Sequence, residues 1–477
     1  MDLDDWFKRE VVSFLVLTPT SNSPQPVHVL NGLFHALLSG KRSARAAIDF
    51  VAPKKGGAWA VGTTALRERS TLKLPRDDAR LEKARRSVSA LIAADGAVYG
   101  DGFASFQLAN LGLVTSDKTH HHLGDLAAQV LTASPEGCRA VGELVARLRM
   151  PQPNPHWSVE AAFVDLANVN RWEVEPPQRG SWWGMDSRCE GLARELNALM
   201  VRATRLCASG VDTLIGLQTL AAAATWVGLI VYAQVPQLCS GKPLATLLPE
   251  AGAPGALATV RAASVSVLDT LDGNFQEWLC SLLRDEVRSR VGSQDIEPLD
   301  VFRVLADVKA KTKMSGGTSR SPQDLAAMYR VWAIDHEPLD ALARTLQESV
   351  QDSMGNKARD WFAAVGRHCG FVGPRRGKPA RLRVEVALVP ALILAGLSED
   401  DGETVPFSTW LARMAARYGV VFGPNHLTRS MSPRPSDEEL RQNQLDLAGL
   451  FSSLGLARLY NDSVTEILNP FYVWARQ

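Results

Sequence analysis

The uncharged segment at residues 213–233 constrains the fold more than any other part of the chain. It reads TLIGLQTLAAAATWVGLIVYA, and as a helix it is about long enough to cross a lipid bilayer once. Alanine is frequent in it, polar side chains such as Gln218 and Thr225 interrupt it, and no basic cluster flanks it closely to set an orientation in a membrane. We therefore predict a buried central helix and no contact with the membrane, with a membrane span as the alternative.

The composition favours a soluble protein with a large core around that helix. The chain has 477 residues, of which 46% are hydrophobic and 22% charged, and its formal net charge is +1. These values are ordinary for globular proteins, and the length suggests about two to four domains. The start, MDLDDWFKRE, lacks a basic region followed by an apolar run, so we expect a cytoplasmic protein. The six cysteines form no CxxC pair, which predicts reduced core thiols and neither a metal site nor a cofactor.

Hydrophobic periodicity predicts a mainly α, multidomain chain that proline and glycine divide into units. One β-prone exception is the apolar run at 11–17. The strongest predicted helices are at 29–38, 81–94, 123–131, 189–208, 213–235, 257–271, 275–291, 322–350 and 357–365. The predicted units are an N-terminal α/β region at 1–150, a helical bundle at 185–310, a helical segment with a basic extended loop at 322–379, and a winged-helix-like domain at 380–477.

The C-terminal unit has the clearest predicted architecture. Helices are expected at 382–397 and 407–418, and Ser436 with Glu439 three positions later is a capping-box pattern that starts a third helix. That helix stops at Gly455 and is followed by a hairpin with strands at 456–459 and 464–468. Three helices and a terminal hairpin predict a winged helix.

A similar order of elements is predicted near the N-terminus. A helix ends in the Asn-Leu-Gly-Leu of 110–113, a polar hairpin is expected at 114–122, and a helix follows. This order suggests a second winged-helix unit there. The histidines at 120–122 are interpreted as part of a solvated hairpin, with a wing tip that contacts nucleic acid or a metal site as alternatives.

Catalytic sequence motifs are missing from the chain. The Gly-Lys-Pro sequences at 241–243 and 377–379 place proline where a phosphate-binding loop needs Ser or Thr, and both lack the preceding glycine of that loop. No GxSxG or HExxH sequence occurs either. We therefore expect a protein that is not an enzyme.

The stretch from 357 to 383 is strongly basic. It holds eight Lys or Arg residues against the single acid Asp360, and glycine and proline keep its middle extended. Such a segment can neutralise the phosphates of a nucleic acid, although a solvated loop or docking to an acidic protein are alternatives. The candidate contacts with nucleic acid are Arg367, Arg375, Arg376, Lys378, Arg381 and Arg383.

The third helix of the C-terminal unit gives a mixed signal. Arg441 and Gln444 are candidates to reach base edges in a major groove. Four acids lie on the same helix and repel phosphate, which favours protein contacts, or DNA contacts made chiefly by the wing and the basic loop before it. These acids are Asp437, Glu438, Glu439 and Asp446.

Three C-terminal stretches carry a resemblance: RYGVVFG at 417–423, LGLARLYND at 454–462 and NPF at 469–471. This end of the chain resembles the ends of large uncharacterised bacterial proteins encoded beside DNA methylases, ATPases and nucleases in anti-phage defence clusters, either methylation-associated or phosphorothioation-linked. The resemblance implies a non-catalytic accessory or scaffold subunit whose partners are DNA and the protein subunits of a defence complex. A stand-alone winged-helix transcription regulator and an enzyme of unfamiliar fold are the alternatives.

Overall fold

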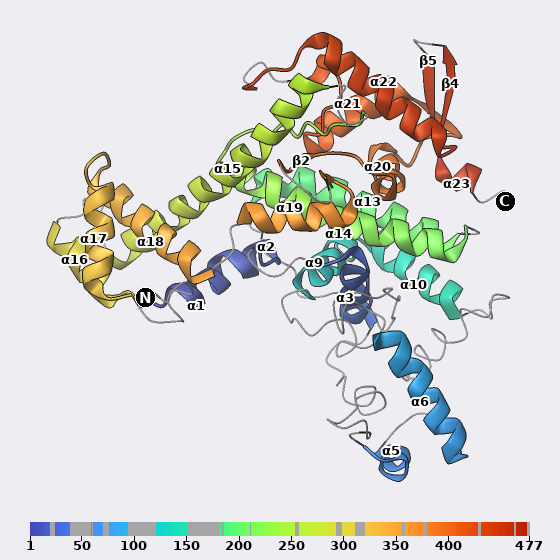
Figure 1. The fold of residues 1–477 in the computed structure, drawn as a ribbon, viewed down its shortest axis with the longest axis horizontal. Helices are drawn as coiled ribbons and strands as arrows, with labels where there is room; N and C mark the ends of the chain where they lie inside the picture. Colours follow the sequence, from blue (N-terminus) through green and yellow to red (C-terminus); the bar gives the residue numbers. More distant parts are fainter. Residues whose placement is uncertain are drawn as a thin grey trace.

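The computed structural model describes most of the chain, and the predicted mainly helical class is confirmed (Figure 1). One large hydrophobic cluster extends from Leu3 to Ile467 through the described residues, and a second, small one joins α15 (Ala258–Val291) to the C-terminal part of the chain. The predicted domain boundaries stay a prediction. The described residues are 1–19, 24–38, 59, 61–69, 76–93, 121–149, 182, 186–209, 211–252, 257–291, 298–310, 320–354, 358–374, 379–427, 431–461 and 464–474.

Helix α14 (Thr213–Cys239) is the centre of this cluster, as the sequence predicts. It packs against α13 (Glu190–Ala208), α3 (Pro26–Leu38), α9 (His121–Leu131), α15 and α19 (Ala358–Cys369). A Cβ atom at Gly228 would lie 2.2 Å from Leu123 Cδ2, so glycine permits the close crossing of α14 and α9. Among the described residues α14 is the one helix long and apolar enough to cross a membrane, but 89% of its most apolar window is buried inside the protein. That burial is typical of the core helix of a soluble protein.

The N-terminal residues differ from two predictions. Residues 11–15 of the run expected to be β-prone belong to the helical turns η1 (Lys8–Val12) and α2 (Ser13–Leu15), which follow α1 (Leu3–Phe7), and residues 16–17 form a turn after them. Val11 and Leu15 are buried in the core, so tertiary packing overrides the local β preference. His121 and His122, expected in a hairpin, begin α9 (His121–Leu131). The rest of the predicted hairpin and of the N-terminal winged helix lies outside the described residues.

Two further N-terminal helices lie close to those predicted at 29–38 and 81–94, whereas the helices at 63–69 and 135–149 were not predicted. Helix α3 crosses α9 where a Cβ atom at Gly124 would lie 2.5 Å from the carbonyl carbon of Gly32, so glycines permit this contact as well. The bounds are α3 (Pro26–Leu38), α5 (Thr63–Arg69), α6 (Asp78–Ala93) and α10 (Pro135–Arg149).

Helix α15 (Ala258–Val291) is continuous over 34 residues, where two shorter helices were expected. Gly273 does not interrupt it. The predicted helix at 322–350 is instead two helices, because the chain turns before Pro338. In Figure 1, α15 runs between α16–α18 and the C-terminal part of the chain. The bounds are α16 (Pro298–Asp307), α17 (Pro322–Trp332), α18 (Pro338–Met354) and α19 (Ala358–Cys369).

The C-terminal part combines several helices with a small antiparallel sheet of order β3–β5–β4. The helix predicted from Leu382 begins later, because Leu382 belongs to a strand that pairs with Val372. The bounds are β1 (Val372–Gly373), β2 (Arg381–Leu382), η4 (Val386–Leu388), α20 (Val389–Gly396), β3 (Thr404–Pro406), α21 (Phe407–Tyr418), η5 (Pro424–His426), α22 (Asp437–Ser453), β4 (Ala457–Asn461), β5 (Val464–Leu468) and α23 (Pro470–Val473).

Buried polar side chains of α13 and α14 hold this C-terminal part. Arg202 Nε donates to the carbonyl of Leu394 at 2.8 Å. Gln234 Nε2 donates to the carbonyls of Ala245 and Tyr418 at 2.9 and 2.8 Å. The bonds to Leu394 and Tyr418 satisfy backbone groups at the ends of α20 and α21 that would be costly to bury alone.

Candidate nucleic-acid interface

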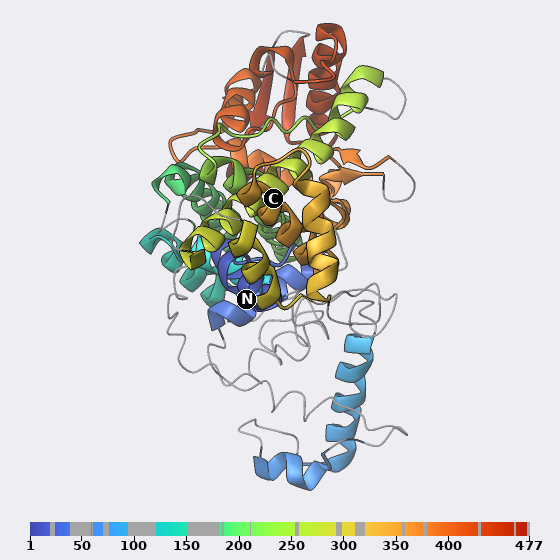
Figure 2. The same cartoon turned by 90° about the vertical axis from the view of Figure 1, so that its left-hand side faces the viewer.

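The predicted basic loop joins the two strands of a hairpin. Gly373 pairs with Arg381, and Val372 with Leu382, in antiparallel register. Residues 374–380 connect these strands and include Arg375, Arg376 and Lys378, which lie outside the described residues. Figure 2 shows the hairpin next to α15 and below the C-terminal helices.

A buried ion-pair cluster fixes the base of this hairpin. Glu250 is fully buried, and its two carboxylate oxygens accept hydrogen bonds from Arg381 Nε and, at 2.7 Å, from Arg261 Nη2. The Glu250 backbone continues the pairing, since its N–H donates to the carbonyl of Leu382 at 3.0 Å. Arg381 is 7% exposed. Its position favours an anchoring role over the predicted contact with nucleic acid, because its guanidinium already faces a buried carboxylate.

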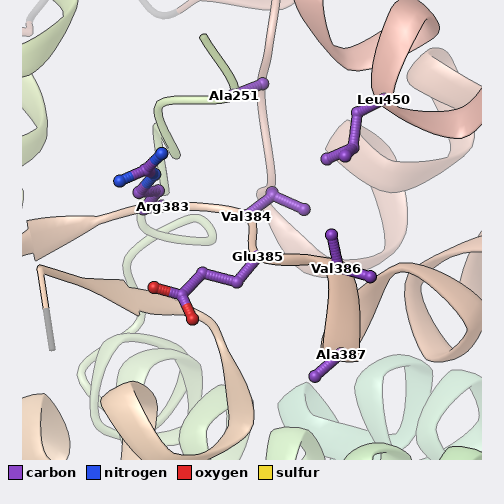
Figure 3. Close-up of a pocket in the computed structure, with 7 residues that line it drawn as sticks. All are labelled: Ala251, Arg383, Val384, Glu385, Val386, Ala387 and Leu450. Atoms are coloured by element: carbon purple, nitrogen blue, oxygen red, sulfur yellow. The ribbon is translucent and has the colours of Figure 1, made fainter. Parts of the chain in front are cut away.

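Arg383 lies at the edge of a pocket between the hairpin and α22 (Figure 3). The pocket has a volume of about 520 Å³. Val384, Val386 and Leu450 form an apolar side, whereas the Arg383 and Glu385 side chains lie on the other side. Arg367 on α19 and Arg383 just after β2 are both half-buried.

The start of α22 is docked on the start of α15. Glu439 Oε2 accepts hydrogen bonds from Thr259 N at 2.7 Å, Thr259 Oγ1 at 2.8 Å and Val260 N at 3.1 Å. Partial burial would raise the pKa of Glu439, but these hydrogen bonds outweigh it and hold the pKa below its usual value. The predicted capping box is half formed: Ser436 Oγ accepts from Glu439 N at 3.2 Å, while the Glu439 carboxylate caps α15 instead.

Asn443 makes a second buried connection from α22. Its Nδ2 donates to the carbonyls of Pro249 and Phe422, both at 3.1 Å, and its Oδ1 accepts from Ala251 N at 2.7 Å. The segment 249–251 is therefore held from two sides. Glu250 joins it to the hairpin, and Pro249 and Ala251 join it to α22.

The structure separates the two candidate base contacts on α22. Arg441 is exposed, whereas Gln444 is half-buried beside Gly423, where a Cβ atom would lie 2.4 Å from Gln444 Oε1. Of the four acids, Glu439 is turned to α15 and Asp446 packs beside Gly252. The exposed face of α22 carries Asp437, Glu438, Arg441, Gln442 and Leu445.

Two cysteines that are distant in the sequence lie together in the fold. Cys189 Sγ and Cys239 Sγ lie 3.9 Å apart although the residues are separated by 50 positions. With the carboxylate of Asp186 they form a group in which all three possible ligand atoms lie within 4.8 Å of one another. Both cysteines were expected to be reduced core thiols, and no local spacing in the sequence could have revealed that the two sulfurs lie together.

A polar pocket of about 500 Å³ begins close to Cys239, since Ser240 and Lys242 line it. Its charged side chains are engaged with one another or with neighbours. Lys242 pairs with Glu277 at 2.7 Å, and Arg284 pairs with Asp340.

Comparisons of the chain with protein-family models, with curated proteins and with solved structures found no match. The interpretation of these surfaces therefore depends on their own geometry.

Proposed function

We propose that this protein is a cytoplasmic, non-catalytic accessory subunit of a bacterial anti-phage defence complex or another DNA-processing complex. In this proposal it contacts the phosphate backbone through the basic loop between β1 and β2. The observation that carries the proposal is the segment 249–251, which holds both the hairpin and α22 by buried polar contacts. Attribution to defence complexes is based on the C-terminal resemblance.

The order of elements supports a winged-helix interpretation of the C-terminal unit. Helix α20, strand β3, helices α21 and α22, and the β4–β5 hairpin follow one another along the chain, and the sheet order is β3–β5–β4. A helix–turn–helix followed by a hairpin is the arrangement that many DNA-binding proteins use. In this proposal the unit lies beside the nucleic acid while the basic loop supplies most of the affinity.

Charge distribution favours the loop over α22 as the main contact. Residues 374–380 hold Arg375, Arg376 and Lys378 and no acid. The exposed face of α22 has two acids, Asp437 and Glu438, near Arg441, so phosphates are not attracted to it as a whole. Contacts with phosphates position a protein on nucleic acid without specifying sequence.

Salt-dependent binding to double-stranded DNA tests the proposal. Replacing Arg375, Arg376 and Lys378 with Ala should weaken binding and reduce the slope of log K against log salt by up to about three contacts, at about 0.9 per contact. A matched control replaces Arg80, Lys83 and Arg86, three exposed basic residues of α6, and should leave the slope unchanged. Equal binding of the loop variant and the parent at every salt concentration contradicts the proposal.

A protein partner is the second candidate function. Leu445 on α22 is 51% exposed, and Leu459 and Tyr460 on β4 are 51% and 58% exposed. Apolar side chains exposed on neighbouring elements favour contact with a protein over contact with phosphates. The stand-alone regulator alternative requires sequence-specific binding that falls on Arg441→Ala, whereas binding through the loop should be similar for different sequences.

A further inference from the structure

The paired cysteines lie where the N-terminal end of α13 meets the C-terminal end of α14. Cys189 ends the turn η3 (Ser187–Cys189), which leads into α13, and Cys239 is the last residue of α14. Cys189 is fully buried, but Cys239 is half-buried next to the exposed Ser240. A sulfur separation of 3.9 Å is a contact between two thiols, and a disulfide bond of about 2.05 Å needs only a small approach of the two side chains.

A cation lies beside these sulfurs. Arg188 donates from Nε to Asp186 Oδ1 at 2.8 Å and from Nη2 to Asp186 Oδ2 at 2.5 Å. A hydrogen bond from Cys239 and the nearby Arg188 charge lower the pKa of the Cys189 thiol, while the same hydrogen bond and burial raise the pKa of Cys239. The two sulfurs therefore share a proton as the pair ionises, which favours one thiolate beside one thiol.

The other cysteines lack this environment. Burial raises the pKa of Cys207 and of Cys369 to about 12 in each case, so both stay protonated at neutral pH. Burial also raises the pKa of Cys280. Reactivity of a cysteine follows its thiolate fraction and its exposure. The pair combines a thiol of lowered pKa, Cys189, with a half-buried sulfur, Cys239, whereas Cys207, Cys280 and Cys369 are buried.

We propose that Cys189 and Cys239 form a redox-active dithiol that a peroxide oxidises to an intramolecular disulfide. Transfer of the shared proton to Cys189 puts the negative charge on the half-exposed Cys239, which attacks the peroxide. A bond forms between Cys239 Sγ and one peroxide oxygen, the O–O bond breaks, and the leaving hydroxide takes the proton from Cys189 to become water. The Cys189 thiolate then attacks Cys239 Sγ, the S–S bond forms, and the S–O bond breaks to release a second water after protonation. The dithiol loses two electrons, and hydrogen peroxide gains them.

A soft metal ion is the competing occupant of this site. Two thiolates bound to one zinc ion at about 2.3 Å are also separated by close to 4 Å. Both oxygens of Asp186, the third possible ligand, already accept hydrogen bonds from Arg188, whose positive charge repels a cation. These contacts favour the dithiol over a metal site.

The experiment treats the full-length protein with hydrogen peroxide, blocks the remaining thiols under denaturing conditions, and maps the peptides without reduction. We expect two of the six cysteines to become protected, a single cross-linked peptide pair containing Cys189 and Cys239, and recovery of all six thiols after dithiothreitol. Cys239→Ser should abolish the cross-link, whereas Cys138→Ser, at another half-buried cysteine, should leave it intact. Six free thiols after treatment, a different pair, or irreversible over-oxidation overturns the proposal.

Two further measurements distinguish the dithiol from the metal site and test the role of Arg188. One equivalent of zinc in the purified protein, released on blocking the thiols, also overturns the proposal. In Arg188→Gln, the pH midpoint for alkylation of the pair should move upward while the fold is retained, because Arg188 is half-exposed. An unchanged midpoint removes Arg188 from the proposed mechanism and contradicts the charge argument for the pair.

Discussion

The two sides of the segment 249–251 are held by opposite kinds of polar chemistry. On the hairpin side a buried carboxylate, Glu250, faces the guanidinium groups of Arg381 and Arg261. On the α22 side a neutral amide, Asn443, satisfies backbone groups only. Removing one member of a buried ion pair leaves an uncompensated charge, whereas removing a neutral partner leaves only unpaired dipoles. The same segment should thus tolerate change much better on one side than on the other.

The largest expected loss of stability follows substitution of Glu250, on the hairpin side of the segment 249–251. Glu250→Gln leaves Arg381 buried without a counter-charge and should lower the free energy of unfolding in urea by about 3–5 kcal/mol. Glu277→Gln is the control, because its partner Lys242 lies on the surface and such pairs contribute about 0–1 kcal/mol. If both variants lose the same small amount, the buried cluster does not hold the hairpin.

Substitution on the neutral side, at Asn443, should lower the free energy of unfolding by less. Asn443→Ala leaves Ala251 N–H and the carbonyl of Pro249 without their partner and should cost about 1–3 kcal/mol. Gln442→Ala, at an exposed position on the same helix, should change the free energy of unfolding by less than about 0.5 kcal/mol. An Asn443→Ala cost above that of Glu250→Gln would break the comparison.

A smaller effect belongs to the Glu439 cap of α15. Its pKa is lowered in the folded state, so its stabilisation is present above the unfolded pKa of about 4.3 and is lost as pH falls through the folded value. Glu439→Gln should cost about 1 kcal/mol at pH 7 and little at acidic pH. Thermal unfolding over this pH range measures it, with Glu438→Gln as the exposed neighbour. If Glu439→Gln loses the same stability at acidic pH as at pH 7, the loss comes from altered packing or hydrogen-bond geometry and not from the missing charge.

The smallest effect on stability is expected on the outer face of α22. Leu445→Gln should alter the free energy of unfolding by no more than about 0.5 kcal/mol, because the side chain is half-exposed. The Leu445→Gln variant should nevertheless capture less of a partner protein from the native cells, while it still binds DNA. Unchanged capture of every partner would remove this face from the second candidate function.

The sequence predicted the bounds of a helix correctly where proline precedes the helix and glycine follows it. Helix α21 has the predicted bounds, because Pro406 precedes it and Gly419 adopts a left-handed φ of 71° after it. The apolar run from Leu382 was assigned entirely to a helix, since periodicity alone does not separate a short buried strand from a buried helix. Its first residue pairs with Val372 instead.

Contacts between distant residues could not be predicted in this way. Glu250 and Arg381 are 131 positions apart, and Ala251 and Asn443 are 192 apart. The basic residues between 357 and 383 were grouped by proximity in the sequence, but Arg381 is buried while Arg367 and Arg383 are partly buried on different elements. A charge cluster in the sequence thus contains both anchoring and surface residues, and only the tertiary contacts tell them apart.

The unbroken helix α15 fixes the distance between the α16–α18 region and the C-terminal part of the chain. Its 34 residues span about 50 Å at 1.5 Å per residue, which equals roughly fifteen base-pair steps of DNA. One end receives the Glu439 cap from α22, and Arg284 near the other end pairs with Asp340 of α18. In the proposed complex, α15 would therefore be a rigid spacer. It would keep a partner bound near α16–α18 at a fixed distance from the DNA or protein bound by the C-terminal unit.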